Sequence, residues 1–319
     1  MKGRKSYRAE LLMGAEIAQE HFERSLALAP DFTLARAALA MSSVRTWWGG
    51  GPAQQQVRGE RAAQDVQRAI DEAPDLAETH LARAMFETQH GRFAEAARAL
   101  SRALEIAPTM ADAHQYLGEL QCEAGRAKEG RKRLELALEL DPTSNISRIS
   151  LARQAALRGD FAEAYRLLDE VSERLGRADV PLATARLRYA IWRGDHAGRR
   201  AIQEAFSRSG SPFAPFMALA ALLDDPARID AIEHSRVMLQ AQIKNLRLRS
   251  LIGQLTTEVY ALAGHPERAL EILDEVASAI LIDVEWMEHC PAIEPLRQSR
   301  TFAESLAKVR ARAAAIWAR

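Results

Sequence analysis

Glycine and proline recur in this chain at a nearly fixed spacing, and this spacing constrains the fold more than any other feature. Successive glycines of one set lie 34, 34, 35 and 70 residues apart, and successive prolines of another lie 44, 34 and 34 apart. The sets are Gly91, Gly125, Gly159, Gly194 and Gly264, and Pro30, Pro74, Pro108 and Pro142. Such a period is typical of stacked helical hairpins. It predicts an all-α solenoid that offers a binding surface rather than a catalytic pocket.

The residues at these recurring glycine and proline positions explain why a helix ends there. Gly91 opens the segment Gly-Arg-Phe-Ala-Glu-Ala, and Gly159 opens Gly-Asp-Phe-Ala-Glu-Ala. Glycine adopts the left-handed conformation of a helix C-cap without a Cβ penalty. Pro108 and Pro142 lie at the end of the second helix of a repeat. Proline ends a helix there because it has no N–H to donate and disfavours a helical conformation of the residue before it. Each repeat is therefore predicted to be helix, Gly turn, helix, Pro turn.

Small residues recur where the two helices of a pair must touch closely. Five residues after a turn glycine come Ala96, Ala164 and Ala269, each followed four residues later by Leu100, Leu168 and Leu273. With Leu117-Gly118, Ala137 and Pro142 at set offsets, the chain resembles the tetratricopeptide repeat family. Gly130 departs from the pattern, since it replaces a packing alanine at a cost of about 1 kcal/mol of helix propensity. The resemblance implies a right-handed superhelix of helix pairs with a concave groove that docks a protein or peptide.

The C-terminal part of the chain carries a second resemblance. The segment 283–297, Asp-Val-Glu-Trp-Met-Glu-His-Cys-Pro-Ala-Ile-Glu-Pro-Leu-Arg, precedes a basic, Ala-rich helix. It looks like the tail of tetratricopeptide regions in multidomain bacterial signalling proteins, where such regions follow Ser/Thr kinase, nucleotide cyclase and winged-helix domains. The resemblance implies a regulatory or scaffold role in bacterial signalling.

The spacing also predicts how the chain is divided. Residues 1–176 are predicted to form regular repeats, with a loop insertion near 47–57 because the first proline gap is ten residues longer than the others. Residues 177–283 are predicted to be degenerate repeats, and 284–319 a tail motif with a C-terminal capping helix whose apolar stripe closes the solenoid. All of this is expected to form one continuous superhelix.

Composition excludes several function classes. Formal charge is zero from 43 basic and 43 acidic residues, which argues against nucleic acid or a membrane surface as partner. Cys122 and Cys290 offer neither a disulfide framework nor metal-ligand spacing, which favours a cytoplasmic location. No apolar stretch is long enough to span a bilayer, and no apolar core follows the first five residues to make a signal peptide. Phosphate-loop, zinc-protease and nucleophile-elbow motifs are absent, so we expect no enzyme, cofactor or metal.

The candidate binding surface lies on the first helix of each repeat. Residues at helical spacing before each turn glycine share one face, and in the resembled family that face lines the groove. These candidate groove residues are Glu78, Leu81, Met85, Asp112, Gln115, Glu119, Ile149, Arg153, Thr184 and Arg188. The groove would grade from acidic to basic, which suits a protein segment of the opposite charge order, unless the face is only a solvated inner wall. Reversing Arg153 and Arg188 to Glu is expected to abolish partner capture without unfolding.

Other surfaces remain open as alternatives. Trp47 and Trp48 beside a glycine-rich loop are either an exposed anchor or packed against the first repeats. Self-association through that loop or through the solenoid ends would make a homo-oligomer. An irregular pocket at 181–226 would instead make a small-molecule sensor or enzyme. His80 and His114, 34 residues apart, are interpreted as packed core histidines rather than as a metal pair.

Overall fold

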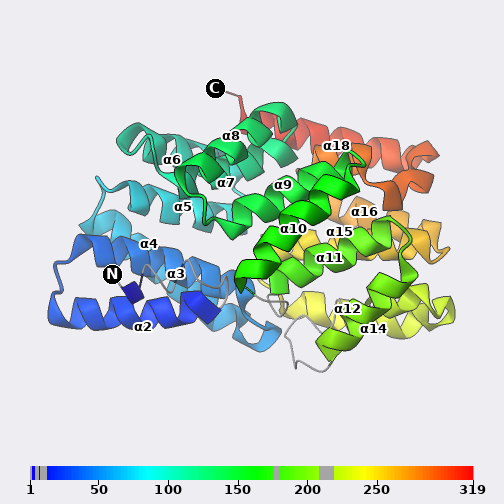
Figure 1. The fold of residues 1–319 in the computed structure, drawn as a ribbon, viewed down its shortest axis with the longest axis horizontal. Helices are drawn as coiled ribbons and strands as arrows, with labels where there is room; N and C mark the ends of the chain where they lie inside the picture. The colour runs from blue at the N-terminus through cyan, green and yellow to red at the C-terminus, as the bar shows by residue number, and fades with distance from the viewer. Residues whose placement is uncertain (1, 4–6, 8–12, 176–179, 208–218, 319) are drawn as a thin grey trace. The chain divides into compact units, whose positions relative to one another are not determined.

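The computed structural model describes residues 2–3, 7, 13–175, 180–207 and 219–318, and every regular element in these ranges is helical (Figure 1). The helices of the first half are α2 (Met13–Leu28), α3 (Thr33–Gly49), η1 (Pro52–Gln54), α4 (Gln55–Glu72), α5 (Ala77–Gln89), α6 (Phe93–Ile106), α7 (Ala111–Glu123) and α8 (Ala127–Leu140). Those that follow are α9 (Asn145–Leu157), α10 (Phe161–Leu175), α11 (Val180–Trp192), α12 (His196–Ser207), η2 (Ala221–Leu223), η3 (Pro226–Arg228), α14 (Ile229–Gln242), α15 (Leu246–Leu262), α16 (Pro266–Ala279), α17 (Val284–His289), η4 (Pro291–Gln298) and α18 (Arg300–Ile316). The fold is all-α, of the α-solenoid class.

The helices group into two compact units, which are described separately below. The first unit holds residues 1–120, 132–147 and 244–247, and the second holds 121–131, 148–243 and 248–319. The predicted boundaries after residues 176 and 283 both fall within the second unit. They stay predictions, as does the single continuous superhelix.

Glycine turns end the first helix of five helix pairs, as the spacing predicted. All five marked glycines have a positive φ, between 67° and 83°. The residue after the glycine donates its N–H back across the turn: Asp160 N–H to Ala155 O at 2.9 Å, and His265 N–H to Tyr260 O at 2.9 Å. This bond satisfies carbonyls that the helix end leaves without partners. The Gly part of the predicted turn pattern is confirmed.

Replacing Gly159 with alanine is therefore expected to lower the free energy of unfolding by about 1–2 kcal/mol, the cost of a left-handed residue that carries a Cβ. An added Cβ would meet no atom within 4 Å, so the cost comes from the backbone, whose φ is +80°. Gly51 is the matched control, because its Cβ would also meet open space but its φ lies outside the left-handed region. Urea unfolding of both variants checks this, and equal losses would contradict the turn argument.

The longer first proline gap is not taken up by a loop, so the predicted loop insertion near 47–57 is wrong. Helices α3 and α4 have 17 and 18 residues, whereas α5 and α6 have 13 and 14. Only residues 50–54 separate α3 from α4, and η1 takes up three of them. Gln55 closes this turn, since its side-chain amide donates to Trp47 O and Gly50 O. The extra residues lengthen both helices because alanine, glutamine and arginine around them are good helix formers.

The predicted alternation of small and large residues forms the core between paired helices. All six positions are buried: Ala96, Leu100, Ala164, Leu168, Ala269 and Leu273. Small residues let the helix axes approach, and leucine one turn later fills the space beside them. Helix pairing in both units therefore follows directly from the repeat pattern.

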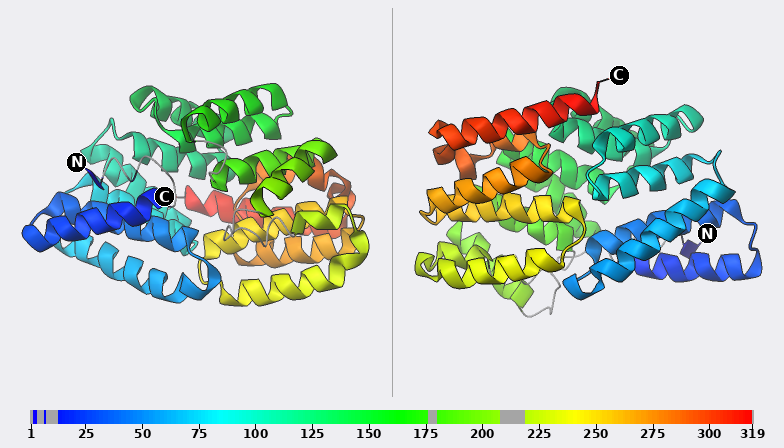
Figure 2. Two further views of the ribbon diagram at one scale, coloured as in Figure 1. Left: turned by 60° about the horizontal axis from the view of Figure 1, so that its bottom comes forward. Right: turned by 180° about the vertical axis from the view of Figure 1, so that it is seen from behind.

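Helix α18 covers the end of the second unit and lies alongside α16 (Figure 2). Its buried stripe is Phe302, Ser305, Val309, Ala313 and Ile316. Arg312 donates to the carbonyls of Ala277 and Leu281 at 2.8 and 2.7 Å, next to the C-terminus of α16. A cation at that end satisfies orphan carbonyls and complements the helix dipole. The predicted capping helix is confirmed.

Candidate functional site

The inner-face positions of the first unit are largely filled by the chain itself. Leu81, Met85 and Gln115 are buried, and the Tyr7 hydroxyl donates to the Met85 sulfur at 4.0 Å. These three side chains were predicted to meet a partner, and this is wrong because they already pack inside the unit. The remaining candidates there, Glu78, Asp112 and Glu119, are half-buried, and their role in binding stays a prediction.

Arg45 holds Tyr7 in this position. Its guanidinium lies 3.5 Å from the centre of the Tyr7 ring and donates to the Tyr7 carbonyl at 2.8 Å. The hydroxyl of Tyr116, on α7, shares the same arginine. Burial raises the pKa of Tyr7 well above its usual range, even though Arg45 opposes this shift. A neutral phenol stacked on a cation is a stable arrangement away from water, so the inner face is occupied where Tyr7 lies.

The second unit contains a buried polar cluster centred on Glu258 of α15. Arg188 of α11 donates its Nε to both Glu258 carboxylate oxygens, at 2.9 and 3.0 Å. Trp192 and Trp286 donate their indole N–H groups to the same carboxylate at 2.9 and 2.6 Å. Arg188, Glu258 and Trp286 are all buried. One carboxylate thus neutralises the arginine and joins α11, α15 and α17, which is how a buried charge becomes tolerable.

Asp283 extends this cluster toward α9. Its carboxylate accepts from Arg153 at 2.5 Å, from Gln254 at 3.1 Å and from the backbone N–H of Trp286 at 3.0 Å. The last bond makes Asp283 the N-cap of α17. Burial disfavours a charged Arg153, but Asp283 together with Glu123, Tyr189 and Glu258 outweighs that effect and raises the pKa of the guanidinium. We call Arg153, Arg188, Glu258, Asp283 and Trp286 the Glu258 cluster.

Two residues that were predicted to line the groove, Arg153 and Arg188, belong to the Glu258 cluster. Arg188 is buried in an ion pair with Glu258, so it is not placed to meet a partner. Arg153 is bound by Asp283 but its side chain is 18% exposed, and its part in binding stays a prediction. Reversal of both to Glu would place like charges beside Glu258 and Asp283, so we expect the reversed variants to be destabilised rather than to lose a partner alone. Ile149 and Thr184 are half-buried, and their part in binding stays a prediction.

The packing role of the tail segment, residues 283–297, was not predicted, although the sequence contains one indication of it. Glu258 is the single charged residue in the stretch Leu-Ile-Gly-Gln-Leu-Thr-Thr-Glu-Val-Tyr-Ala-Leu from 251 to 262. A lone charge among apolar residues must find a buried partner. Asp283 and Trp286 of the tail belong to the cluster, and the Cys290 thiol donates to the Glu258 carboxylate at 3.8 Å. Burial raises the pKa of the Cys290 thiol well above its usual range, which leaves it an inert core residue.

Trp47 is packed rather than exposed, so its role as an exposed anchor is wrong. Only 2% of its surface is accessible, and its ring centre lies 5.9 Å from that of Phe86 and 5.0 Å from that of His90. Gly59 of α4 lets the indole approach, because a Cβ there would come within 3.1 Å of the ring. Trp48 is half-buried and has a partner of its own. The alternative that the pair packs on the first repeats holds for Trp47.

The histidine pair and the basic last helix also have structural partners. His114 lies with Nε2 at 2.8 Å from Pro108 O, and its Nδ1 faces Arg133 at 3.1 Å. His80 makes the equivalent contact with the backbone of Pro74. Lys308 and Arg310 of α18 pair with Asp274 and Glu288. In the described part of the chain, no group of three or more His, Cys, Asp or Glu could hold a metal ion.

The region proposed as an irregular small-molecule pocket is only partly within the described residues, since 208–218 lie outside them. Arg199 of α12 is buried and donates to Asp224 at 2.6 and 2.8 Å and to Ala220 O at 3.2 Å. These bonds, with Arg200 adding to them, hold the pKa of Asp224 well below its usual range. Arg199 and Asp224 thus form an ion pair with each other, and their contacts hold α12 against η2.

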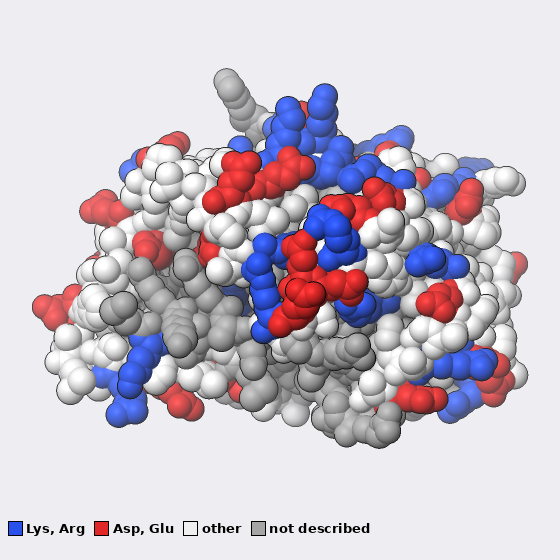
Figure 3. Space-filling view, in the orientation of Figure 1, with Lys and Arg blue, Asp and Glu red and all other residues white. Residues whose placement is uncertain are grey.

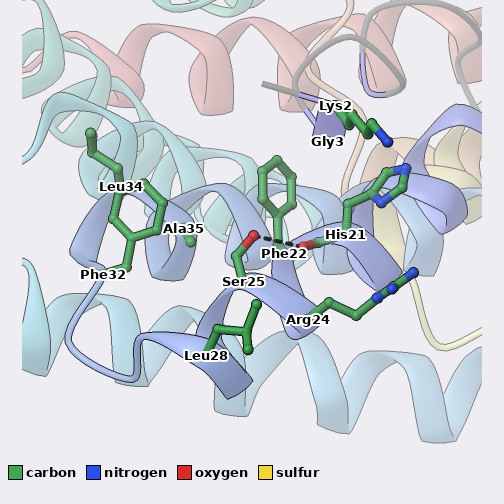
Figure 4. Close-up of a pocket in the computed structure, with 10 residues that line it drawn as sticks. All are labelled: Lys2, Gly3, His21, Phe22, Arg24, Ser25, Leu28, Phe32, Leu34 and Ala35. Carbon is green, nitrogen blue, oxygen red and sulfur yellow. Dashed lines mark hydrogen bonds between the residues drawn. The ribbon is translucent and has the colours of Figure 1, made fainter.

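A cavity of about 530 Å³ lies in the first unit where α2 turns into α3 (Figure 4). We call it the edge pocket; its lining residues are Lys2, Gly3, His21, Phe22, Arg24, Ser25, Leu28, Phe32, Leu34 and Ala35. Three large apolar side chains on its lining stay exposed, with accessible fractions of 90% for Leu28, 46% for Phe32 and 38% for Leu34. A cavity of this size with exposed apolar walls is typical of a binding site.

The apolar residues around Pro30 already indicate an exposed apolar surface in the sequence, although the groove hypothesis did not use them. Leu28, Phe32 and Leu34 lie two residues before, two after and four after Pro30. At the same offsets around Pro74 the chain has Glu72, Leu76 and Glu78. Around the later prolines these positions also include a polar residue, Asp112 or Ser144. The first Pro turn alone is apolar at all three positions.

Charge does not single out another surface on the face shown in Figure 3. Basic and acidic side chains lie interspersed there, in keeping with a net charge of zero. None of the described helices is long and apolar enough to cross a bilayer. The edge pocket is therefore distinguished by exposed apolar surface rather than by charge density.

Comparison with known proteins supports the repeat interpretation. A family model for the tetratricopeptide repeat matches residues 87–155. A chain of the APC/C hetero-tetramer Cut9–Hcn1 is 14% identical with a TM-score of 0.53, over 95% of this chain and 53% of that one, so this chain spans about half its length.

Two bacterial structures are also similar. Pseudomonas aeruginosa PilF is 18% identical over 64% of this chain and 89% of its own, with a TM-score of 0.41. A tetratricopeptide repeat protein from Parabacteroides merdae ATCC 43184 is 15% identical over 93% and 92%, with a TM-score of 0.42. The search of curated proteins gives no match. At these identities, the likeness to the Cut9–Hcn1 chain bears on the fold alone.

Proposed function

Since this chain is a tetratricopeptide repeat protein, we propose that it is a protein-interaction module that docks a partner at the edge pocket of its first unit. Repeats of this kind generally serve as protein-binding scaffolds rather than as enzymes. The observation that carries the proposal is the exposed apolar lining of the edge pocket, Leu28, Phe32 and Leu34. Apolar surface left around a cavity is what a partner side chain can bury.

The inner faces support docking less well. In the first unit Tyr7 packs on Met85, and in the second the tail segment binds Arg153 through Asp283. A partner would have to displace these contacts before it could bind there, and that displacement costs free energy that open surface does not. The edge pocket requires no such rearrangement, so we place docking there.

A reducing cytoplasm is part of the proposal. Cys122 and Cys290 are both buried thiols that form no disulfide. Their burial suits a compartment in which cysteine serves as a small apolar residue. The proposed role is that of a scaffold that presents one protein to another, with no chemistry of its own.

The test compares two apolar-to-charged variants, Leu28→Asp in the edge pocket and Val57→Asp on α4. Val57 is also apolar and 68% exposed but does not line the pocket, which makes it the matched control. Each purified chain captures proteins from a lysate of source cells, and quantitative mass spectrometry compares the proteins bound. We expect a set retained by the intact chain and by Val57→Asp but depleted at least tenfold by Leu28→Asp. Equal capture by all three chains would overturn the proposal, once circular dichroism shows equal helicity.

A further inference from the structure

We propose that the edge pocket binds an acidic segment of a partner protein that inserts one large apolar side chain. This inference rests on the proposed function, because it names the chemistry of the partner that docks at the same pocket. It follows from three features of the pocket: the separation of its apolar and basic sides, the state of its basic groups, and its size.

The lining is divided into two sides (Figure 4). Leu28, Phe32 and Leu34 lie toward one side, and Lys2, His21 and Arg24 lie toward the other. None of the lining residues that the structure describes is acidic. A ligand that fits both sides must present an apolar group to the first and negative charge to the second. An acidic segment with a leucine-like or phenylalanine-like side chain has this chemistry.

Arg24 is the basic group best placed to receive a carboxylate. It is exposed on α2, and no ion pair joins it to Glu20 or Glu23 on the same helix. Glu23 is instead bound by Arg61 of α4. The Ser25 hydroxyl donates to the His21 carbonyl at 2.9 Å, so it does not compete for the ligand. Arg24 therefore keeps donors for a planar, two-oxygen partner, which suits a carboxylate.

The volume of the pocket limits what enters it. About 530 Å³ is within the range of pockets that hold a small ligand, and it suits one or two side chains rather than a helix face. The rest of the partner segment must then cross the basic side, where its charges meet Arg24. Recognition by exposed charges is weakened by salt, whereas insertion of the apolar side chain is not.

Three fluorescein-labelled octapeptides serve as probes, each with a central Phe-Leu pair flanked by pairs of Glu, Gln or Lys. Their binding to the full chain is measured by fluorescence anisotropy at low ionic strength and again in about 1 M salt, where the screening length falls to about 3 Å. We expect the Glu peptide to bind at least tenfold more tightly than the Lys peptide, with the Gln peptide between them. The difference should largely vanish in high salt.

Two charge reversals test the site. Arg24→Glu is expected to abolish the preference for the Glu peptide, whereas Arg228→Glu, a reversal at another exposed arginine in the second unit, should leave it unchanged. Leu28→Asp should weaken binding of all three peptides. Circular dichroism of each variant confirms that the helices are intact.

The outcomes separate this inference from the proposed function. If the Glu and Lys peptides bind equally and both are lost in Leu28→Asp, the acidic partner is wrong although the pocket still docks proteins. The acidic partner is also wrong if no peptide binds while Leu28→Asp still depletes captured proteins. Sedimentation that shows a dimer abolished by Leu28→Asp would make a second copy of this chain the occupant. Equal capture by the intact chain, Val57→Asp and Leu28→Asp overturns the docking function itself, and this inference with it.

Discussion

Replacing Arg188 with alanine is expected to destabilise the second unit by about 3–5 kcal/mol, because it leaves a buried carboxylate without its cation. Glu258 is buried and has Arg188 as its ion-pair partner, with two indole N–H groups as additional donors. Urea unfolding followed by tryptophan fluorescence measures the loss, since Trp192 and Trp286 donate to that carboxylate. Without Arg188, these N–H bonds cannot balance the charge.

Two further variants test the reason for this loss. The double variant Arg188→Met/Glu258→Leu removes both charges and should recover part of the stability, but not all, since Trp192 and Trp286 lose their acceptor. Arg200→Ala breaks an exposed pair with Asp224 and should cost no more than about 1 kcal/mol. A loss for Arg188→Ala as small as that for Arg200→Ala would contradict the buried ion pair.

Replacing Trp47 with alanine is expected to destabilise the first unit by about 3–5 kcal/mol, the usual cost of deleting a buried aromatic side chain. The indole is buried between Phe86, His90 and the helix that carries Gly59. Removal of the indole leaves a cavity that these neighbours cannot fill unless whole helices move. Thermal unfolding by circular dichroism, with urea unfolding beside it, measures the change.

The exposed residue Val57 supplies the comparison for Trp47. Val57→Ala should change the free energy of unfolding by less than about 0.5 kcal/mol, as surface substitutions usually do. The two variants also separate packing from binding. If Trp47→Ala left stability unchanged but abolished partner capture, the tryptophan would be a binding anchor after all, and the packed position would be contradicted.

Turn positions and helix pairing could be predicted from the sequence because they depend on local chemistry. The five glycines adopt positive φ since only glycine does so at little cost. The alanine and leucine positions form the core because their spacing puts them on one face. The lengths of α3 and α4 could not be predicted from local chemistry. The ten extra residues between Pro30 and Pro74 are compatible with either a loop or longer helices.

The candidate site was less predictable because burial depends on contacts between distant residues. Arg188 and Glu258 are 70 residues apart, and Arg153 and Asp283 are 130 apart. Helical spacing places the arginines on an inner face but does not show that the chain supplies their partners. The edge pocket could have been found by comparing the Pro turns, since only the first keeps three apolar residues around it.

Under the proposed function, partners dock at the edge pocket and not on the inner face of the first unit. The most direct measurement places a photo-crosslinking phenylalanine analogue at Leu28 in one variant and at Glu78 in another. Both are illuminated in source-cell lysate, and the adducts are identified by mass spectrometry. Position 28 borders the pocket, whereas position 78 lies at the start of α5 on the predicted groove. We expect protein adducts at position 28 that are absent at position 78, whereas adducts at 78 alone would show that partners dock on the inner face instead.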